Sequence, residues 1–297
     1  MTDLVLTTAD GVRLTARWWR PPPGTPDLGM AVVVVHGFSS RKDGAEVEMV
    51  AASQVAAGRR VLTFDLRGHG GSEGATTLGF RERLDVDAAV AAARADADAV
   101  VVVGASMGGV ASIDHLAGPA APSPSADVPA GRPDGDGRGR SRSPHPGPAA
   151  VAGTDGPDPR ADGAVVVGTP ALWQVPRSTR GVIAVALTQT RVGRAVTARR
   201  LGTRVAVRPG RGAPPVDRIA RVTRPMAVVH GLADPFVSAT AARLLFEAAS
   251  EPRLLDLVPG MGHGFTPAAV EPVAAAVGWI VDELARDGRA GAPGRRV

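Results

Sequence analysis

The sequence of 297 residues contains no cysteine, which excludes disulfide bonds, thiolate catalysis and cysteine-ligated zinc. Aromatic residues make up only 3% of the chain, so a core must be built mostly from valine, alanine and leucine. No apolar run approaches the roughly 20 residues that a membrane-spanning helix needs. The first residues also lack the basic and apolar regions of a secretory signal. We therefore expect a soluble, cytoplasmic protein.

Acidic residues are nearly missing from one part of the chain. Residues 171–224 contain twelve arginines and a single acid, Asp217, although the whole chain has a net charge of only +5. Such a block could bind an anionic substrate or make peripheral contact with an acidic membrane. It could equally form a solvated face, since Lys42 is the only lysine of an arginine-rich protein. Nucleic acid is not expected as a partner, because no base-reading motif accompanies the charge. The oligomeric state stays open.

Short valine-rich runs alternate with segments of helical spacing, a pattern typical of a mostly parallel sheet with helices on both faces. The fold class predicted from this alternation is α/β. We expect about eight strands, at 5–6, 12–19, 30–36, 61–64, 99–103, 164–168, 226–230 and 253–258. We expect helices at 44–57, 84–95, 110–116, 182–200, 239–249 and 270–284.

Residues 118–163 interrupt this pattern. They contain ten prolines, nine glycines and no aromatic residue, so they cannot bury enough apolar surface to offset the entropy of ordering. We predict a disordered insertion there. The remaining chain divides into a core (1–117, 164–170 and 216–286), an arginine-rich region (171–215) and a flexible tail (287–297).

The stretch from Gly104 to Gly108 matches the pattern G-x-S-x-G around Ser106. It lies between a predicted strand and a predicted helix, which is the context that this motif requires. Glycines on both sides let the chain turn sharply and lift the serine hydroxyl clear of the sheet. Ser106 is therefore a candidate nucleophile, whereas the alternative is a glycine-rich turn with a bystander serine.

A serine hydroxyl needs a general base, and the sequence offers six histidines. His263 stands apart because it lies in the glycine-rich loop between the last strand and the last helix. Loops at the carboxyl edge of an open sheet are where α/β sites form. The other histidines lie at strand ends, on the nucleophile helix, in the insertion or in a loop (His36, His69, His115, His145 and His230).

Asp234 lies in the corresponding loop one strand earlier and is the candidate that orients His263. An aspartate before a proline could instead serve as a helix cap or turn residue. The chain order Ser106, Asp234, His263 matches the order of one architecture and differs from those of chymotrypsin and subtilisin. Two N–H donors should hold the oxyanion. The backbone N–H groups of Met107 and Phe38 are placed for this role.

With these motifs the chain resembles the α/β-hydrolase superfamily. Within it, Asp65-Leu-Arg-Gly-His-Gly-Gly-Ser72 is similar to the D-x-R-G-H-G-x-S segment of the serine aminopeptidase and monoacylglycerol lipase-like branch. The resemblance implies that Asp65, Arg67 and His69 are structural, and that residues 171–215 form a small cap over the pocket. The insertion is not a feature of that family.

The leading hypothesis is a serine hydrolase that cleaves a carboxylic ester or thioester, either small or lipid-like and with an anionic substrate as one option, through Ser106, His263 and Asp234. It requires neither a metal nor a cofactor. Acyl transfer or perhydrolysis at the same site is the first alternative. Peptide N-termini are disfavoured as substrates, because the cap lacks a carboxylate for an ammonium group. A non-catalytic binding protein on the same fold is the alternative of a different class. Dehalogenase chemistry would need a carboxylate at position 106.

Overall fold

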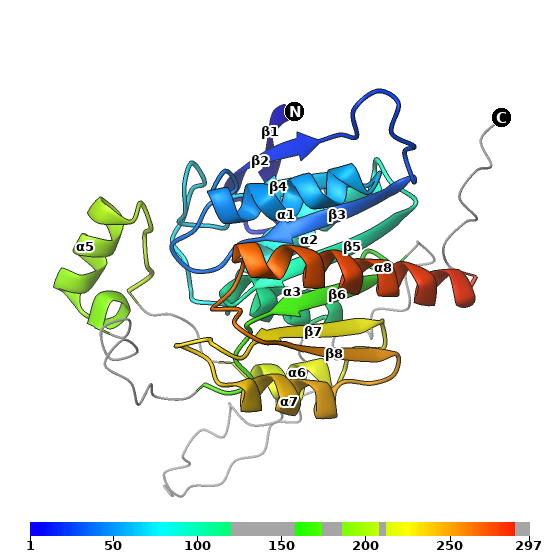
Figure 1. The fold of residues 1–297 in the computed structure, drawn as a ribbon. Helices are drawn as coiled ribbons and strands as arrows, with labels where there is room; N and C mark the ends of the chain where they lie inside the picture. Colours follow the sequence, from blue (N-terminus) through cyan, green and yellow to red (C-terminus); the bar gives the residue numbers. More distant parts are fainter. Residues whose placement is uncertain (120–157, 174–185, 208–211, 289–297) are drawn as a thin grey trace, which may run out of the picture. The chain divides into compact units, whose positions relative to one another are not determined.

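The computed structural model describes residues 1–119, 158–173, 186–207 and 212–288, whose helices and strands are drawn in Figure 1. An eight-stranded sheet runs in the order β1-β2-β4-β3-β5-β6-β7-β8. The strands are β1 (Thr2–Thr7), β2 (Arg13–Trp19), β3 (Met30–Val35), β4 (Arg60–Phe64), β5 (Ala99–Ala105), β6 (Gly163–Val167), β7 (Met226–Gly231) and β8 (Arg253–Val258). Only the β1–β2 and β2–β4 pairs are antiparallel. The predicted α/β class with a mostly parallel sheet is confirmed.

Helices cover both faces of the sheet, which explains why its central strands are uninterrupted valine runs. Side chains alternate along a strand, so Val32 and Val34 belong to one buried cluster and Val33 and Val35 to the other. The first cluster packs against α1 (Ala45–Ala56) and α8 (Val270–Arg286), which lie together on one face in Figure 1. The second packs against α2 (Arg83–Arg94), α3 (Met107–Ala117), α6 (Pro215–Ile219) and α7 (Ala239–Ala248).

The single helix predicted over 182–200 is wrong in the part that the structure describes. Residues 186–189 are helical, the chain then breaks at Thr190, and α5 begins anew as Arg191–Arg200. Thr190 has an extended backbone and its hydroxyl oxygen accepts a hydrogen bond from the N–H of Gly193 at 2.9 Å. A threonine in this conformation caps a new helix instead of continuing the old one. Residues 182–185 lie outside the described part.

The end of the predicted insertion also differs from the structure. Residues 120–157 lie outside the described part, but residues 158–163 do not, and Gly163 is the first residue of β6. The N–H of Ala161 donates to Nε2 of His115 at 2.9 Å, and the guanidinium of Arg160 donates to the carbonyl of Leu116 at 3.2 Å. These contacts with α3 fix a segment whose composition alone predicts disorder.

The topology brings three loops to one edge of the sheet. The strands β5, β7 and β8 are mutually parallel through β6, so the chain leaves all of them at the same edge. Ser106, Asp234 and His263 each follow one of these strands. A short 3-10 helix, η1 (Pro267–Ala269), then leads from the last loop into α8. None of the helices in the described ranges combines the length and apolar composition of a membrane span.

Candidate active site

Ser106 occupies a strained turn between β5 and α3. Its backbone lies at φ 50° and ψ −113°, in the left-handed region that non-glycine residues rarely enter. Its N–H donates to the carbonyl of Val167 on β6 at 2.8 Å. A Cβ at Gly108 would collide with the carbonyl oxygen of Val35, and one at Gly104 with the hydroxyl of Ser112. The two glycines therefore allow the close packing that holds the turn.

His263 and Asp234 reach Ser106 from two further loops. Nε2 of His263 lies 2.9 Å from the hydroxyl oxygen of Ser106, and Nδ1 lies 2.7 Å from Oδ2 of Asp234. Because the carboxylate can only accept at Nδ1, this nitrogen carries the proton and Nε2 is left with a lone pair toward the serine. The structure thus joins the three predicted side chains in one hydrogen-bonded chain.

Asp234 is fixed by its own loop as well as by His263. Its side chain is only 1% exposed, and its Oδ1 accepts the N–H groups of Phe236 at 2.8 Å and Val237 at 3.0 Å. Burial acts to raise the pKa of Asp234, but the bonds from His263, Val237 and Phe236 outweigh it and hold that pKa below its ordinary value. The group is therefore a buried carboxylate that stays charged, as an orienting acid requires.

The two predicted oxyanion donors belong to segments that adjoin Ser106. Met107 is the first residue of α3, where a helix leaves its N–H groups without an intrahelical partner. Phe38 follows β3 and lines the same cavity as Ser106. Next to it, Gly37 approaches so closely that a Cβ there would lie 3.5 Å from the Cβ of Ser106.

Two buried histidines brace the loop that carries Phe38. Nε2 of His36 accepts the N–H of Leu66 at 3.0 Å, and Nδ1 donates to the carbonyl of Gly37 at 2.7 Å. His69 accepts the N–H of Ser39 at 3.3 Å through its own Nε2. Burial lowers the pKa of both imidazoles, that of His36 to about 3. Both are neutral supports of this loop.

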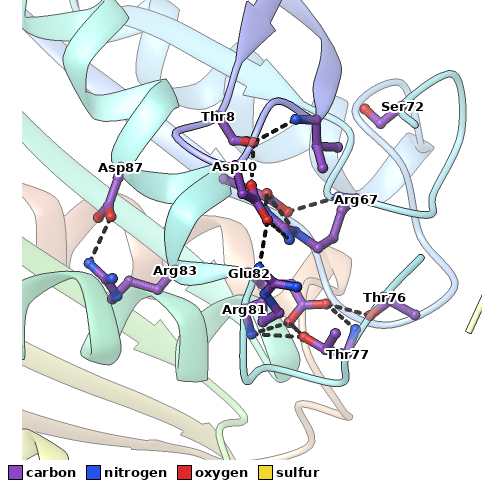
Figure 2. A network of polar contacts seen from close by, with 12 residues as sticks. Thr8, Asp10, Arg67, Ser72, Thr76, Thr77, Arg81, Glu82, Arg83 and Asp87 are labelled. Atoms are coloured by element: carbon purple, nitrogen blue, oxygen red, sulfur yellow. Dashed lines mark hydrogen bonds and ion pairs between the residues drawn. The ribbon is translucent and has the colours of Figure 1, made fainter. Parts of the chain in front are cut away.

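The segment 65–72 has a structural role: its side chains bond to several other parts of the fold. Asp65 is 1% exposed and accepts hydrogen bonds from Thr15, the N–H of Lys42 and the N–H of Gly71. Arg67 lies at the centre of the polar network in Figure 2. Its guanidinium donates to Asp10 in the turn after β1 at 2.9 Å, and to Asp85 on α2 at 2.8 Å. This segment therefore ties the hairpin and α2 to the loop after β4.

Two of the other histidines make different contacts. Nδ1 of His115 bonds to Asp87 at 2.7 Å. Nε2 of the buried His230 contacts the carbonyl of Val237 at 3.0 Å and lies 4.0 Å from Oδ2 of Asp234, so His230 is a neighbour of the site. His145 lies outside the described residues. Over the described ranges no group of three histidine or acidic side chains has the arrangement of a metal site.

A cavity of about 710 Å³ opens beside Ser106 and His263. Its wall is largely apolar, with Phe38, Leu187, Leu201, Phe236, Val237 and Phe265 among the lining residues. No arginine belongs to the described part of this wall, and Glu46 is its one carboxylate. Glu46 is not among the predicted site residues; in the sequence it is only an acid in the first turn of α1, the helix that follows the Phe38 loop.

Comparisons with known proteins agree with this architecture. The structural match to an esterase from Pyrococcus furiosus covers 95% of this chain and 90% of that esterase, with 19% identity and a TM-score of 0.64. The match to an esterase from Rhodococcus sp. covers 98% of this chain and 100% of that esterase, with 19% identity and a TM-score of 0.56. These likenesses show a shared fold. An uncharacterized protein of Mycobacterium tuberculosis is 44% identical over 50 residues, which span 17% of this chain and only 18% of that protein.

The model of one family matches residues 32–276, a range that includes Ser106, Asp234 and His263. That match extends from within β3 to within α8 and includes the loops that carry the three side chains. The chain belongs to the alpha/beta hydrolase family.

Proposed function

We propose that this protein is a serine hydrolase that cleaves a carboxylic ester or thioester through an acyl-enzyme. The observation that carries the proposal is the unbroken hydrogen-bonded chain from Ser106 through His263 to the buried Asp234, opening onto an apolar cavity. A nucleophile, a base and an orienting acid in contact are what acyl transfer to serine needs.

In the first half of the proposed reaction, the hydroxyl oxygen of Ser106 attacks the acyl carbon while Nε2 of His263 takes its proton. The charge on the carbonyl oxygen is held by the N–H groups of Met107 and Phe38. Nε2 then gives its proton to the departing alcohol or thiol, and the acyl group remains on Ser106. Asp234 stabilises the imidazolium throughout.

Water completes the proposed cycle in the same way. His263 takes a proton from water as its oxygen attacks the acyl-enzyme, and then returns a proton to the oxygen of Ser106 as the carboxylic acid leaves. The hydrogen-bond contacts of His263 with Ser106 and with Asp234 support these proton transfers.

The segment from Asp65 to Ser72 supports assignment to the serine aminopeptidase and monoacylglycerol lipase-like branch of the family. Its contacts are of the structural kind that this branch implies for Asp65 and Arg67. We assign the part of the chain between β6 and α6 to a cap over the cavity, because Leu187 and Leu201 from this part line the wall. The apolar wall suits a hydrocarbon acyl group.

A fluorophosphonate probe tests the proposal directly, because it phosphonylates an activated serine. We expect labelling of the purified protein and turnover of p-nitrophenyl esters, both abolished in Ser106→Ala. A series of acyl chain lengths on the unmodified protein then measures the size of the cavity. Ser53→Ala, which changes a serine of α1 outside the described cavity wall, is the matched control and should keep the label. A folded protein that neither labels nor turns over esters would contradict the proposal.

A further inference from the structure

His230 is a buried histidine beside the candidate active site, and the proposed reaction gives it no role. It lies near the end of β7 and is 0% exposed. Its Nε2 lies 3.0 Å from the carbonyl oxygen of Val237 and 4.0 Å from Oδ2 of Asp234. Since a carbonyl oxygen can only accept, Nε2 carries the proton and donates to Val237. The ring is therefore bonded to the loop that carries Asp234.

The loop that carries Asp234 is held at both of its ends. At its start, the N–H of Ala233 donates to the carbonyl of Met261 at 3.0 Å, which is a bond between main-chain groups. At its end, by contrast, the bond comes from a side chain, since Nε2 of His230 donates to the carbonyl of Val237. A substitution at position 230 can therefore release the second end without changing the first.

Val237 passes this constraint on to the carboxylate. Its N–H donates to Oδ1 of Asp234 at 3.0 Å, while Oδ2 lies 2.7 Å from Nδ1 of His263. The main chain of Gly168 packs closely against the same pair, because a Cβ there would lie 3.3 Å from Oδ2 and 3.4 Å from Nδ1. A shift of Val237 would therefore move the carboxylate relative to His263 and lengthen the bond between them.

The second nitrogen of His230 shows what an imidazole contributes at this position. Nδ1 is buried and has no hydrogen-bond partner in the described part of the chain. A buried polar atom without a partner costs free energy, and an aliphatic side chain here would avoid that cost. The bond from Nε2 to Val237 is therefore the contribution that distinguishes histidine from a residue that only fills space.

His230 also stays neutral next to the charged pair. Burial lowers its pKa most strongly, and these effects outweigh the bond to Val237 and the charge of Asp234, which raise it; His263 lowers it further. A neutral ring at 4.0 Å does not compete with His263 for the charge of Asp234. His230 can thus hold the loop without weakening the stabilisation of an imidazolium at His263.

We infer that His230 is a positioning residue that acts through Val237. It sets the carboxylate of Asp234 against Nδ1 of His263. The effect on catalysis rests on the proposed function, whereas the geometric part concerns only the bond between these two side chains. His263 takes the proton of Ser106 efficiently only when that bond is in place. Loss of the Nε2 bond should therefore lower kcat and leave KM nearly unchanged, since His230 is absent from the described wall of the cavity.

Two substitutions at position 230 test this bond. His230→Leu removes the donor and keeps much of the bulk, whereas His230→Gln keeps an N–H group for the carbonyl of Val237. In turnover of p-nitrophenyl butyrate we expect kcat to fall about 10- to 100-fold in His230→Leu, as displacement of a catalytic group predicts, and to recover in His230→Gln. His115→Leu removes another buried histidine, which bonds to Asp87 from α3, and is the matched control. It should lose stability but keep kcat.

An NMR measurement reports the geometry without any turnover. The Nδ1 proton of His263 bonds to a carboxylate, which moves its resonance far downfield of other N–H groups. We expect this resonance in the unmodified protein, in His230→Gln and in His115→Leu, and its loss in His230→Leu. Long-range proton–nitrogen correlations identify the protonated ring nitrogen where exchange with water hides the proton. An unchanged resonance in His230→Leu would overturn the inference, and so would its loss in either of the other two variants.

The two measurements separate this inference from the hydrolase proposal. Loss of the resonance in His230→Leu, in a protein without esterase turnover, would refute the reaction and keep the positioning role. An unchanged resonance with normal turnover in His230→Leu would keep the hydrolase and refute the positioning role. If His230→Leu does not fold, His230→Asn takes its place, because its amide is one methylene shorter than that of glutamine and leaves the carbonyl of Val237 without a donor.

Discussion

His36 and His69 are neutral chiefly because they are buried. Nε2 of each ring accepts a backbone N–H, from Leu66 and from Ser39 respectively, and the rings lie 5.0 Å apart between centroids. A proton on Nε2 would point at the N–H that the ring now accepts. Burial of the charge and then repulsion from the second ring lower the pKa of His36, and together they outweigh the bond to the carbonyl of Gly37, which raises it.

This chemistry predicts how stability depends on pH. Unfolded histidines bind a proton below about pH 6.5, whereas His36 stays neutral in the folded state until about pH 3. The unfolded state thus binds more protons in this window, so stability is full above pH 6.5 and falls as the pH is lowered. We expect His36 alone to contribute a slope of up to about 1.4 kcal/mol per pH unit.

Urea unfolding at pH 7.5, 6.5, 5.5 and 4.5 measures that slope. His36→Gln keeps an acceptor for Leu66 but cannot titrate, so its free energy of unfolding should fall less steeply between pH 6.5 and 4.5. His69 and His230, whose pKa values burial also lowers, retain the rest of the slope. Equal slopes in the two proteins would contradict a neutral His36.

At the scale of the element, two helical glycines should respond in opposite ways to the same substitution. Gly108 lies in the first turn of α3 against the carbonyl of Val35, whereas Gly278 lies within α8 and its Cβ would meet nothing nearer than Arg59 at 3.9 Å. We expect Gly108→Ala to destabilise the fold by about 1–3 kcal/mol through overpacking. Gly278→Ala should stabilise it by about 0.5–1 kcal/mol, because glycine costs a helix backbone entropy.

Thermal and urea unfolding of both variants check this pair. Gly108→Ala should also lose fluorophosphonate labelling, because the turn at Ser106 depends on that close approach, while Gly278→Ala should keep it. A Gly108→Ala variant that matches the unmodified protein in stability and labelling would show that the turn does not need a glycine there.

The elements that the sequence predicts well are those with a strong local signal. The valine runs at 30–35 and 99–103 can only satisfy burial on both faces as central strands, and each strand end then locates a site residue at one edge. The break at Thr190 could not be predicted, because the residues on both sides have helical composition and only the backbone distinguishes a capping threonine from an interior one. α6 is too short to show a period.

The same contrast holds for the candidate site. Ser106, Asp234 and His263 each follow a strand in a glycine-rich or turn-rich loop, so their meeting could be anticipated, while their catalytic roles remain predictions. Glu46 gives no such signal, since an acid in the first turn of a helix is usual for reasons of the helix dipole alone. Only the structure shows that Glu46 lines the cavity beside Ser106.

Across the molecule as a whole, the core holds the chain in place both before and after residues 120–157. The guanidinium of Arg221 donates to the carbonyl of Pro119 at 3.1 Å, and Arg160 bonds to Leu116 at 3.2 Å. β6 then pairs with β5 over five residue pairs, from Val101 with Gly163 to Ala105 with Val167. The chain therefore leaves and re-enters the core at neighbouring points that the core itself fixes.

Because the core fixes both ends, we expect that residues 120–157 can be replaced by a linker of about eight glycines and serines without loss of the fold. Closing a shorter loop costs less entropy, so the free energy of unfolding should rise by about 1 kcal/mol. Labelling at Ser106 and turnover of p-nitrophenyl butyrate should match those of the full chain. Urea unfolding and ester turnover of the shortened and full-length proteins measure both effects.

A shortened protein that is destabilised by more than about 2 kcal/mol would show that the segment contributes to the packing of the core, since linker entropy alone cannot produce a loss of that sign. Normal stability with lost turnover would instead assign the segment a part in the reaction.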